Sequence, residues 1–483
     1  MSKKHIHMLG ICGTGMGSLA GLLKEKGFEV TGSDEHVYPP MSTQLERLGI
    51  KLYNGYSASN IPKSQPDVVV IGNVIRRENP EAKEVEGLKI PFKSMPQILI
   101  DEVVGEKKTI VVTGTHGKTT TTSLIGWLLY AMNADPGFLV GGVPLNFEKS
   151  YHVGKGEYFV IEGDEYDTAY FEKTPKFLHY RPRFVIITSI EFDHADIYKN
   201  KDEIIDSFKK LIAIVPDDGL IVANYDDDVV REIVKAARCK VIGYSTHDKG
   251  DYNATMGCAD ESGTQFTIKS KEKNFDFLSK QYGEHNIQNT VAAVALLLNI
   301  GFEATNIEKA LKTFKGITRR QQLVGEVRSV KVIDDFAHHP TAIRETILAM
   351  RLRYPNSRIW SIFEPRSNTS RRNIFQKEFV DALSLSDRII IAPVFKKEAI
   401  AADERLDTER IASELTRRGK FAFAISNVDY IIEFVLRSIA HDDVLLIMSN
   451  GSFDDIHNKF LSALNIRRIS KNQDDVKPTR VPG

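Results

Sequence analysis

The stretch Thr109-Ile-Val-Val-Thr-Gly-Thr-His-Gly-Lys-Thr-Thr-Thr-Thr122 decides the fold of this 483-residue chain. Its β-branched start predicts a buried strand, and the apolar residues at 124, 125, 128 and 129 recur at helical spacing. A strand, a glycine loop and a helix in this order form a phosphate cradle. Gly114 and Gly117 let backbone N–H groups approach phosphate oxygens. Lys118 adds a positive charge, and Thr119 offers a hydroxyl to Mg²⁺.

The composition is that of an ordinary globular protein, with 42% hydrophobic and 27% charged residues. Lys plus Arg and Asp plus Glu both number 64, so charge indicates neither a nucleic acid nor an anionic membrane as partner. The three scattered cysteines favour a reducing compartment over a disulfide framework. No run approaches the roughly 18 apolar residues of a membrane helix. We therefore expect a cytoplasmic protein without membrane or nucleic-acid partners.

Residues 5–34 predict the first βαβ unit of a nucleotide-binding domain. A short strand leads into the glycine turn Gly10-Ile-Cys-Gly-Thr-Gly-Met-Gly17, then a helix, then a strand that ends at Asp34. Asp34 can bond a ribose hydroxyl, or it can cap a helix or a turn. The glycine spacing is not that of a dinucleotide fingerprint, and a UDP-sugar fits equally well. Another buried strand ends at Gly72-Asn73, where ligands of parallel sheets bind.

Two further strands end in acidic residues near the phosphate loop. The strand at 158–161 is followed by Glu162 and more carboxylates up to Asp167, and the strand at 184–190 is followed by Glu191-Phe-Asp-His194. Because Mg²⁺ prefers hard oxygen ligands, Glu162 and His194 are candidates to bind or orient such ions. A solvated charge cluster is the alternative. Residues 245–280 alternate polar and apolar positions, which predicts a small antiparallel excursion.

A helix opening at Gly283-Glu-His-Asn286 carries Asn286 and Asn289 on one face. These amides can contact a nucleotide, or they can cap the helix. Strands at 330–333, 358–363, 388–392 and 444–448 alternate with helices and predict a third α/β domain.

The sequence therefore predicts an α/β protein of three domains. They are an N-terminal Rossmann-like domain (1–107), a central P-loop ATPase-like domain (108–318) and a C-terminal Rossmann-like domain (319–468). A disordered tail (469–483) is expected to follow them.

The loop from Thr113 to Thr120 resembles the ATP loop of the Mur ligases of peptidoglycan synthesis. Three blocks match the L-alanine-adding branch of that family: residues 191–194, 283–286 and 334–340 (Asp-Asp-Phe-Ala-His-His-Pro). Five stretches look more like the murein peptide ligases of cell-wall recycling: residues 11–14, 37–43, 192–197, 364–369 and 448–451. The resemblance extends to about residue 465.

The resemblance implies an ATP-dependent amide ligase. ATP would phosphorylate the lactyl carboxylate of UDP-N-acetylmuramate, and the amine of L-alanyl-γ-D-glutamyl-meso-diaminopimelate would attack the acyl phosphate. The products would be an amide, ADP and phosphate. The L-alanine-adding ligase of peptidoglycan biosynthesis remains the alternative, with the same chemistry and a smaller amine.

The resemblance also implies roles for named residues. Lys118 would hold the γ-phosphate, Thr119 and Glu162 one Mg²⁺, and His194 a second. The remaining ATP-binding residues would be Gly114, Thr115, His116, Gly117, Thr120, Asn286, Asn289, Arg320 and Asp335, with Arg320 also catalytic and Asp335 at the ribose. The UDP-sugar would contact Gly13, Thr14, Gly15, Met16, Asp34 and Asn73.

The peptide is assigned to the loop after the strand at 358–363. Arg366 lies where ligands of parallel sheets bind, and a guanidinium holds a carboxylate through two parallel hydrogen bonds. Asn368 would assist it; a surface arginine at a helix start is the alternative.

Two positions depart from the family pattern. Phe208 aligns with the lysine that several Mur ligases carbamylate, and Phe336 stands where the L-alanine-adding branch typically has tyrosine. The sequence leaves open whether the protein is a monomer or a dimer.

Overall fold

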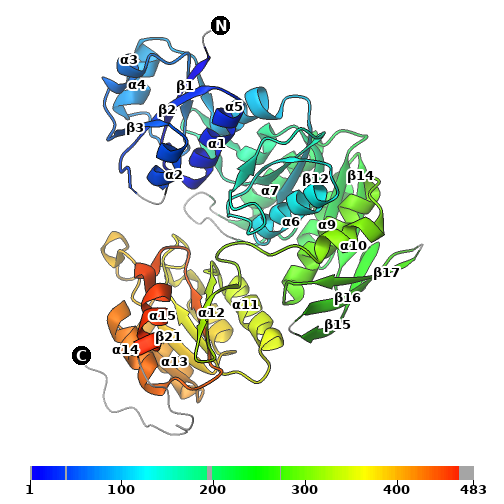
Figure 1. The fold of residues 1–483 in the computed structure, drawn as a ribbon, viewed down its shortest axis with the longest axis vertical. Coiled ribbons are helices and arrows are strands. Elements are labelled where there is room, and N and C mark those ends of the chain that lie inside the picture. The colour runs from blue at the N-terminus through cyan, green and yellow to red at the C-terminus, as the bar shows by residue number, and fades with distance from the viewer. Residues whose placement is uncertain are drawn as a thin grey trace.

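The computed structural model describes residues 3–38, 41–192, 198, 200–260, 262–271 and 273–466. Three α/β units follow one another along the chain, each built on its own sheet (Figure 1). This confirms the predicted α/β class with three units. The predicted tail at 469–483 lies outside the described residues. The predicted domain borders stay predictions, although the chain passes between sheets at residues 105–107 and 312–321.

The N-terminal sheet has five parallel strands in the order β3-β2-β1-β4-β5. Asn79 starts one of its helices by accepting hydrogen bonds from the N–H groups of Glu81 (2.9 Å) and Ala82 (3.3 Å). The elements are β1 (His5–Leu9), α1 (Thr14–Glu25), β2 (Glu29–Asp34), α2 (Met41–Arg47), β3 (Lys51–Asn54), α3 (Asn60–Ser64), β4 (Val68–Ile71), α4 (Pro80–Gly87), β5 (Phe92–Ser94), α5 (Met95–Ile98) and η1 (Leu99–Val104).

The central sheet has the order β17-β16-β15-β14-β13-β12-β6-β9-β7-β8. Its strands are β6 (Lys108–Thr113), β7 (Gly137–Leu139), β8 (Tyr151–His152), β9 (Tyr158–Gly163), β12 (Pro182–Ile187), β13 (Leu220–Asn224), β14 (Lys240–Ser245), β15 (Tyr252–Asp260), β16 (Gly263–Lys269) and β17 (Asn274–Ser279). β6 pairs in parallel with β9 and β12, while β15, β16 and β17 pair antiparallel. The antiparallel excursion is thus confirmed.

The helices of the central domain cover both faces of this sheet. They are α6 (Lys118–Ala131), η2 (Lys176–His179), α7 (Lys201–Ile214), α8 (Asp228–Ile233), η3 (Val234–Ala236), α9 (Glu284–Asn299) and α10 (Ala304–Leu311). A separate hairpin, β10 (Asp167–Ala169) with β11 (Glu172–Pro175), leads into η2.

The C-terminal sheet has the order β18-β19-β23-β20-β21-β22. Its strands are β18 (Gln322–Val327), β19 (Val330–Asp335), β20 (Ile359–Phe363), β21 (Arg388–Ile391), β22 (Phe421–Ala424) and β23 (Val444–Met448). Its helices are α11 (Pro340–Arg353), η4 (Asn373–Phe375), α12 (Gln376–Leu383), η5 (Lys397–Ala399), α13 (Thr408–Arg417), α14 (Val428–Ser438), η6 (Phe453–Asp455) and α15 (Ile456–Ile466). The sequence analysis did not predict β18 and β22. These strands form the two edges of the C-terminal sheet, and they lack a long β-branched run.

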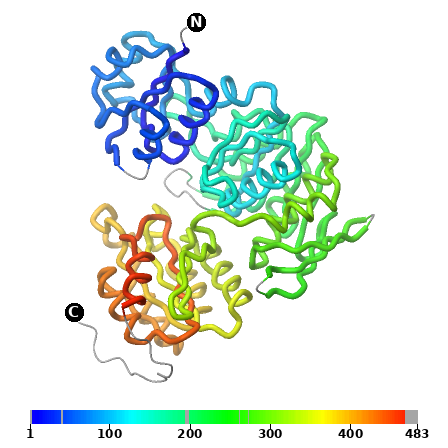
Figure 2. Tube along the Cα trace, viewed as in Figure 1, coloured from blue at the N-terminus to red at the C-terminus, as the bar shows by residue number. Residues whose placement is uncertain are grey.

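The N-terminal and central domains share one continuous cluster of buried hydrophobic residues. The Tyr180 hydroxyl reaches the Met95 sulfur at 4.0 Å, and the hydroxyls of Ser18 and Ser150 are 2.7 Å apart. The C-terminal domain follows residues 312–321 and lies on the same side of the central domain as the N-terminal one (Figure 2). Two domain junctions are therefore available to hold ligands.

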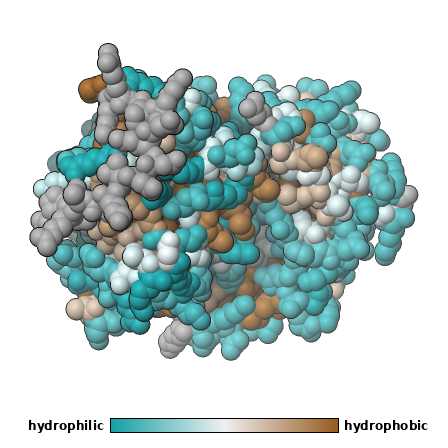
Figure 3. Space-filling model, turned by 90° about the horizontal axis from the view of Figure 1, so that it is seen from below, coloured by the Kyte–Doolittle hydropathy of each residue, from teal (hydrophilic) through white to brown (hydrophobic). Residues whose placement is uncertain are grey.

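In the view of Figure 3, hydrophilic residues cover most of the face, and hydrophobic residues gather in smaller groups, some of them near its middle. Within the described ranges, no helix combines the length and the apolar character needed to cross a membrane.

Candidate active site

The phosphate loop joins β6 to α6 as the sequence predicts. Gly114 has φ +125° and Gly117 has φ +82°, which glycine adopts without strain. A Cβ at Gly114 would lie 2.2 Å from the Thr188 hydroxyl, and one at Gly117 would lie 2.4 Å from the Asn289 side-chain oxygen. The two glycines thus bring neighbouring segments against the loop backbone, and phosphate binding by that backbone stays a prediction.

Lys118 begins α6 and lies beneath the loop. Its ammonium donates to the Gly114 carbonyl at 2.7 Å and pairs with the Glu165 carboxylate at 3.0 Å. The two side chains are only 13% and 4% exposed. Burial lowers the pKa of Lys118, but the carboxylates of Glu165, Asp164 and Glu162 together outweigh burial, so the net pKa is raised. Lys118 is therefore a fixed cation, and Glu165 is a partner to which the sequence reading gave no role.

Thr119 and Glu162 meet beside the loop. The Glu162 carboxylate accepts from the Thr119 hydroxyl at 3.0 Å and from the Gly141 N–H at 2.5 Å. Burial raises the pKa of Glu162, and the charge of Asp164 raises it further. A cation at this oxygen-only cluster would relieve both effects, so the residues fit Mg²⁺. His194, the predicted ligand of a second ion, lies outside the described residues.

A cavity of about 640 Å³ opens over the loop between the central and C-terminal domains. The predicted ATP-binding residues that line it are Thr115, His116, Gly117, Lys118, Thr119, Thr120, Asn286, Asn289, Arg320 and Asp335. The structure thus gathers these residues from three distant segments into one chamber. Their contacts with a nucleotide stay predictions.

Some of these side chains already have structural partners. The Asp335 carboxylate accepts from the N–H groups of Gln321 (2.8 Å) and Ala337 (2.7 Å), and the Asn286 amide donates to the Tyr282 carbonyl at 2.8 Å. Arg320 lies over the Phe336 ring, with its guanidinium carbon 4.9 Å from the ring centre. Phe336, in place of tyrosine, therefore orients an arginine through its ring face.

One cluster links the phosphate loop to the C-terminal domain. The Glu191 carboxylate lies 3.4 Å from the His116 Nε2, accepts from the Thr341 hydroxyl at 2.9 Å, and lies 3.8 Å from the His339 Nδ1. Burial raises the pKa of Glu191, but its interactions with His116, Thr341 and His339 together outweigh burial and bring the pKa to about 2. The ligand atoms of His116, Glu191 and His339 lie within 4.8 Å of one another, close enough to hold a metal ion. As it stands, the cluster is a polar contact between two domains.

A second cavity, about 390 Å³, lies between the N-terminal and central domains. The predicted UDP-sugar residues that line it are Gly13, Thr14, Gly15, Met16 and Asn73. Glu162 lines the same cavity from the opposite side. Asp34 is not among its lining residues, and its carboxylate accepts from the Cys12 N–H at 2.9 Å. In this structure Asp34 therefore caps the glycine turn, as one of its two predicted roles requires.

Arg366 lies at the carboxyl edge of the C-terminal sheet, as the sequence predicts. Its guanidinium carbon is 3.8 Å from the Phe395 ring centre and its Nη1 is 3.7 Å from Glu364. A Cβ on Gly451 would lie 2.0 Å from the Arg366 Nε, so the glycine leaves room for this side chain. The Asn368 side-chain oxygen accepts from Arg371 at 2.7 Å. Peptide binding by Arg366 and Asn368 stays a prediction.

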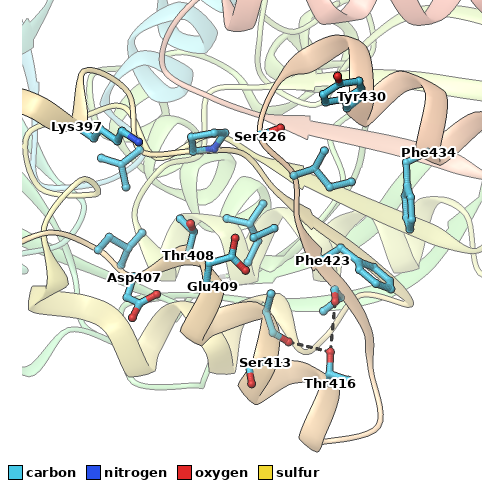
Figure 4. Close-up of a pocket in the computed structure, with 18 of the residues that line it drawn as sticks. Lys397, Asp407, Thr408, Glu409, Ser413, Thr416, Phe423, Ser426, Tyr430 and Phe434 are labelled. Carbon is cyan, nitrogen blue, oxygen red and sulfur yellow. Dashed lines mark hydrogen bonds between the residues drawn. The ribbon is translucent and has the colours of Figure 1, made fainter. Parts of the chain in front are cut away.

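Two other features bear on the site. Phe208 is buried against Phe177, with ring centres 5.5 Å apart, while Lys209 is exposed and pairs with Asp206. Another cavity, of about 960 Å³, lies along β22 between α13 and α14 and is lined by none of the predicted site residues (Figure 4). We therefore do not assign the reaction to this cavity.

Comparisons with known proteins agree with this geometry. The chain matches three family descriptions: "Mur ligase family, catalytic domain" over residues 5–102, "Mur ligase middle domain" over 112–297, and "Mur ligase, glutamate ligase domain" over 319–451.

Three relatives cover nearly the whole chain. A UDP-N-acetylmuramate–L-alanyl-γ-D-glutamyl-meso-2,6-diaminoheptandioate ligase from Escherichia coli is 39% identical, covering 95% of this chain and 98% of that protein. A UDP-N-acetylmuramate–L-alanine ligase from Clostridium kluyveri is 34% identical, covering 96% of this chain and 99% of its own. The crystal structure of a murein peptide ligase from Psychrobacter arcticus is 35% identical, with a TM-score of 0.70 and coverage of 98% and 100%.

Proposed function

The chain belongs to the Mur ligase family, and we propose that it joins the tripeptide L-alanyl-γ-D-glutamyl-meso-diaminopimelate to UDP-N-acetylmuramate at the expense of ATP. The reaction would serve peptidoglycan recycling. The observation that carries the proposal is that the two cavities lie next to each other and are joined by one hydrogen bond between residues that line them. Thr119 lines the phosphate-loop cavity, Glu162 lines the sugar cavity, and their side chains are 3.0 Å apart.

This arrangement suits transfer of a phosphoryl group between two bound substrates. ATP occupies the larger cavity, with its phosphates on the backbone N–H groups of the loop and on Lys118. The muramoyl end of the UDP-sugar reaches Glu162 from the glycine turn at residues 13–16. Mg²⁺, when bound by Thr119 and Glu162, supplies charge neutralisation between the phosphates and the incoming carboxylate.

The chemistry runs in two steps. A lactyl carboxylate oxygen attacks the γ-phosphorus, and ADP leaves. The peptide amine then attacks the acyl carbon, phosphate leaves with the C–O bonding pair, and the nitrogen loses a proton to give the amide. Both steps concentrate negative charge, so positioning and fixed positive charge dominate catalysis. Lys118 supplies such a charge, because Glu165 and the Gly114 carbonyl hold its ammonium in place.

The third domain brings the amine substrate. Arg366 faces the edge where ligands of parallel sheets bind, and the tripeptide carries carboxylates that a guanidinium can hold. The cluster of His116, Glu191 and Thr341 holds this domain against the phosphate loop. A contact of this kind can keep all three substrates within reach of one another.

One experiment tests the function. The protein is incubated with ATP, Mg²⁺ and UDP-N-acetylmuramate plus either the tripeptide or L-alanine, and phosphate release is measured. We expect rapid release with tripeptide and slow release with L-alanine. Equal or faster release with L-alanine would replace the proposal by the biosynthetic L-alanine ligase, the activity named for the Clostridium kluyveri relative.

A further inference from the structure

Lys176 stands at the start of η2, directly after the β10–β11 hairpin. Its side chain lines the cavity between the N-terminal and central domains. All the lining residues belong to the described part of the chain, and among them Lys176 is the one lysine or arginine. The sequence analysis assigned no role to Lys176.

The Lys176 ammonium is held in a defined place. Its Nζ lies 3.3 Å from the Asp164 carboxylate and 4.2 Å from the centre of the Tyr166 ring. The side chain is only 11% exposed. An ion pair on one side and an aromatic face on another restrict a lysine that would otherwise be flexible. The cation is thus fixed beside the cavity that the sugar enters.

The charges around it explain why a cation is needed there. Glu162 and Asp164 both line this cavity, and the charge of Asp164 raises the pKa of Glu162. A substrate carboxylate that enters would face two carboxylates, and like charges at close range repel. Without a positive charge nearby, the cavity would favour a neutral sugar over one bearing a lactyl group.

We propose that Lys176 forms the carboxylate subsite of this cavity and binds the lactyl carboxylate of the muramoyl sugar. The inference rests on the proposed function and adds the residue that selects the acid-bearing sugar. Lys176 would place one carboxylate oxygen toward the phosphate loop while the glycine turn holds the rest of the ligand. Asp164 and Tyr166 act as positioning residues, because they hold the ammonium rather than the substrate.

The test compares two ligands that differ only in the lactyl group. UDP-N-acetylmuramate and UDP-N-acetylglucosamine are titrated calorimetrically into the full-length protein without ATP. The variants are Lys176→Met, Lys176→Arg and the control Lys173→Met. Lys173 is a suitable control, since it belongs to β11, is 67% exposed and pairs with Asp167 outside the cavity.

We expect the wild type and Lys173→Met to prefer UDP-N-acetylmuramate. Lys176→Met should weaken that ligand about 10- to 100-fold, as expected for a lost hydrogen bond between charged groups, and leave UDP-N-acetylglucosamine unchanged. Lys176→Arg should restore part of the preference. Should Lys176→Met fold poorly because Asp164 loses its partner, the double variant Lys176→Met/Asp164→Asn removes both charges and serves the same comparison.

Two results would overturn the inference. Equal weakening of both ligands would assign Lys176 a structural role, and an unchanged preference would remove it from the subsite. A different result would count against the proposed function itself: a wild type that releases phosphate with neither amine and does not distinguish the two sugars. The two failures are therefore distinguishable.

Discussion

The pairing of Lys118 with Glu165 allows the catalytic and structural roles of this lysine to be measured separately. Lys118→Ala removes the ammonium that would stabilise the transferring phosphoryl group. Loss of one such fixed charge typically lowers turnover about 10²–10³-fold, or about 3–4 kcal/mol of barrier. It also leaves Glu165, 4% exposed, without its cation. Breaking a buried pair in this way destabilises a protein by about 3–5 kcal/mol.

The double variant Lys118→Ala/Glu165→Gln separates the two effects. Glutamine keeps the shape of Glu165 without its charge, so most of the lost stability should return. Turnover should remain 10²–10³-fold low, because the fixed cation is still absent. Phosphate release with saturating tripeptide reports turnover, and urea unfolding reports stability. Near-normal turnover in the double variant would refute the assignment of Lys118, and unchanged stability in the single variant would refute the buried pair.

Further predictions concern the metal, the peptide, a partly buried histidine and the domains. Activity should vanish with EDTA and return with Mg²⁺, and Glu162→Ala should raise the Mg²⁺ requirement more than it weakens UDP-sugar binding; an identical Mg²⁺ titration would exclude Glu162. Arg366→Lys should raise the KM for tripeptide with little effect on the KM for ATP. Gly451→Ala should do the same, since the added methyl group displaces the Arg366 guanidinium. Unchanged tripeptide kinetics in these variants would remove Arg366 from the site. Burial lowers the pKa of His285 from 6.5 to about 4, so the unfolded chain binds a proton first as pH falls and stability is lost between pH 6.5 and 4. His285→Gln should flatten this decline in thermal unfolding, whereas an equally steep decline would contradict the assignment. Small-angle scattering should show compaction with an ATP analogue and UDP-sugar together, and superimposable profiles would argue against closure about residues 312–321.

The sequence predicts local structure wherever one segment suffices to specify it. The β-branched run before Gly114 specifies a buried strand, and Gly117-Lys118-Thr119 specifies a helix start of the kind suited to phosphate, because these signals depend on backbone geometry and nearest neighbours. The position of Glu162 follows in the same way from the end of a buried strand. Edge strands such as β22 escape this reasoning, since a short Phe-Ala alternation is stabilised mainly by its neighbours.

Only the tertiary structure decides which side chains meet. Glu165 pairs with Lys118 across 47 positions, and Thr341 reaches Glu191 across 150. Lys176 lines one cavity together with the glycine turn of another domain. Each contact depends on how sheets and domains pack, and many packings satisfy the same hydrophobic pattern along the chain. Sequence therefore determined the phosphate loop and the three α/β units, whereas packing determined the charge partners, the interdomain cluster and the sugar cavity.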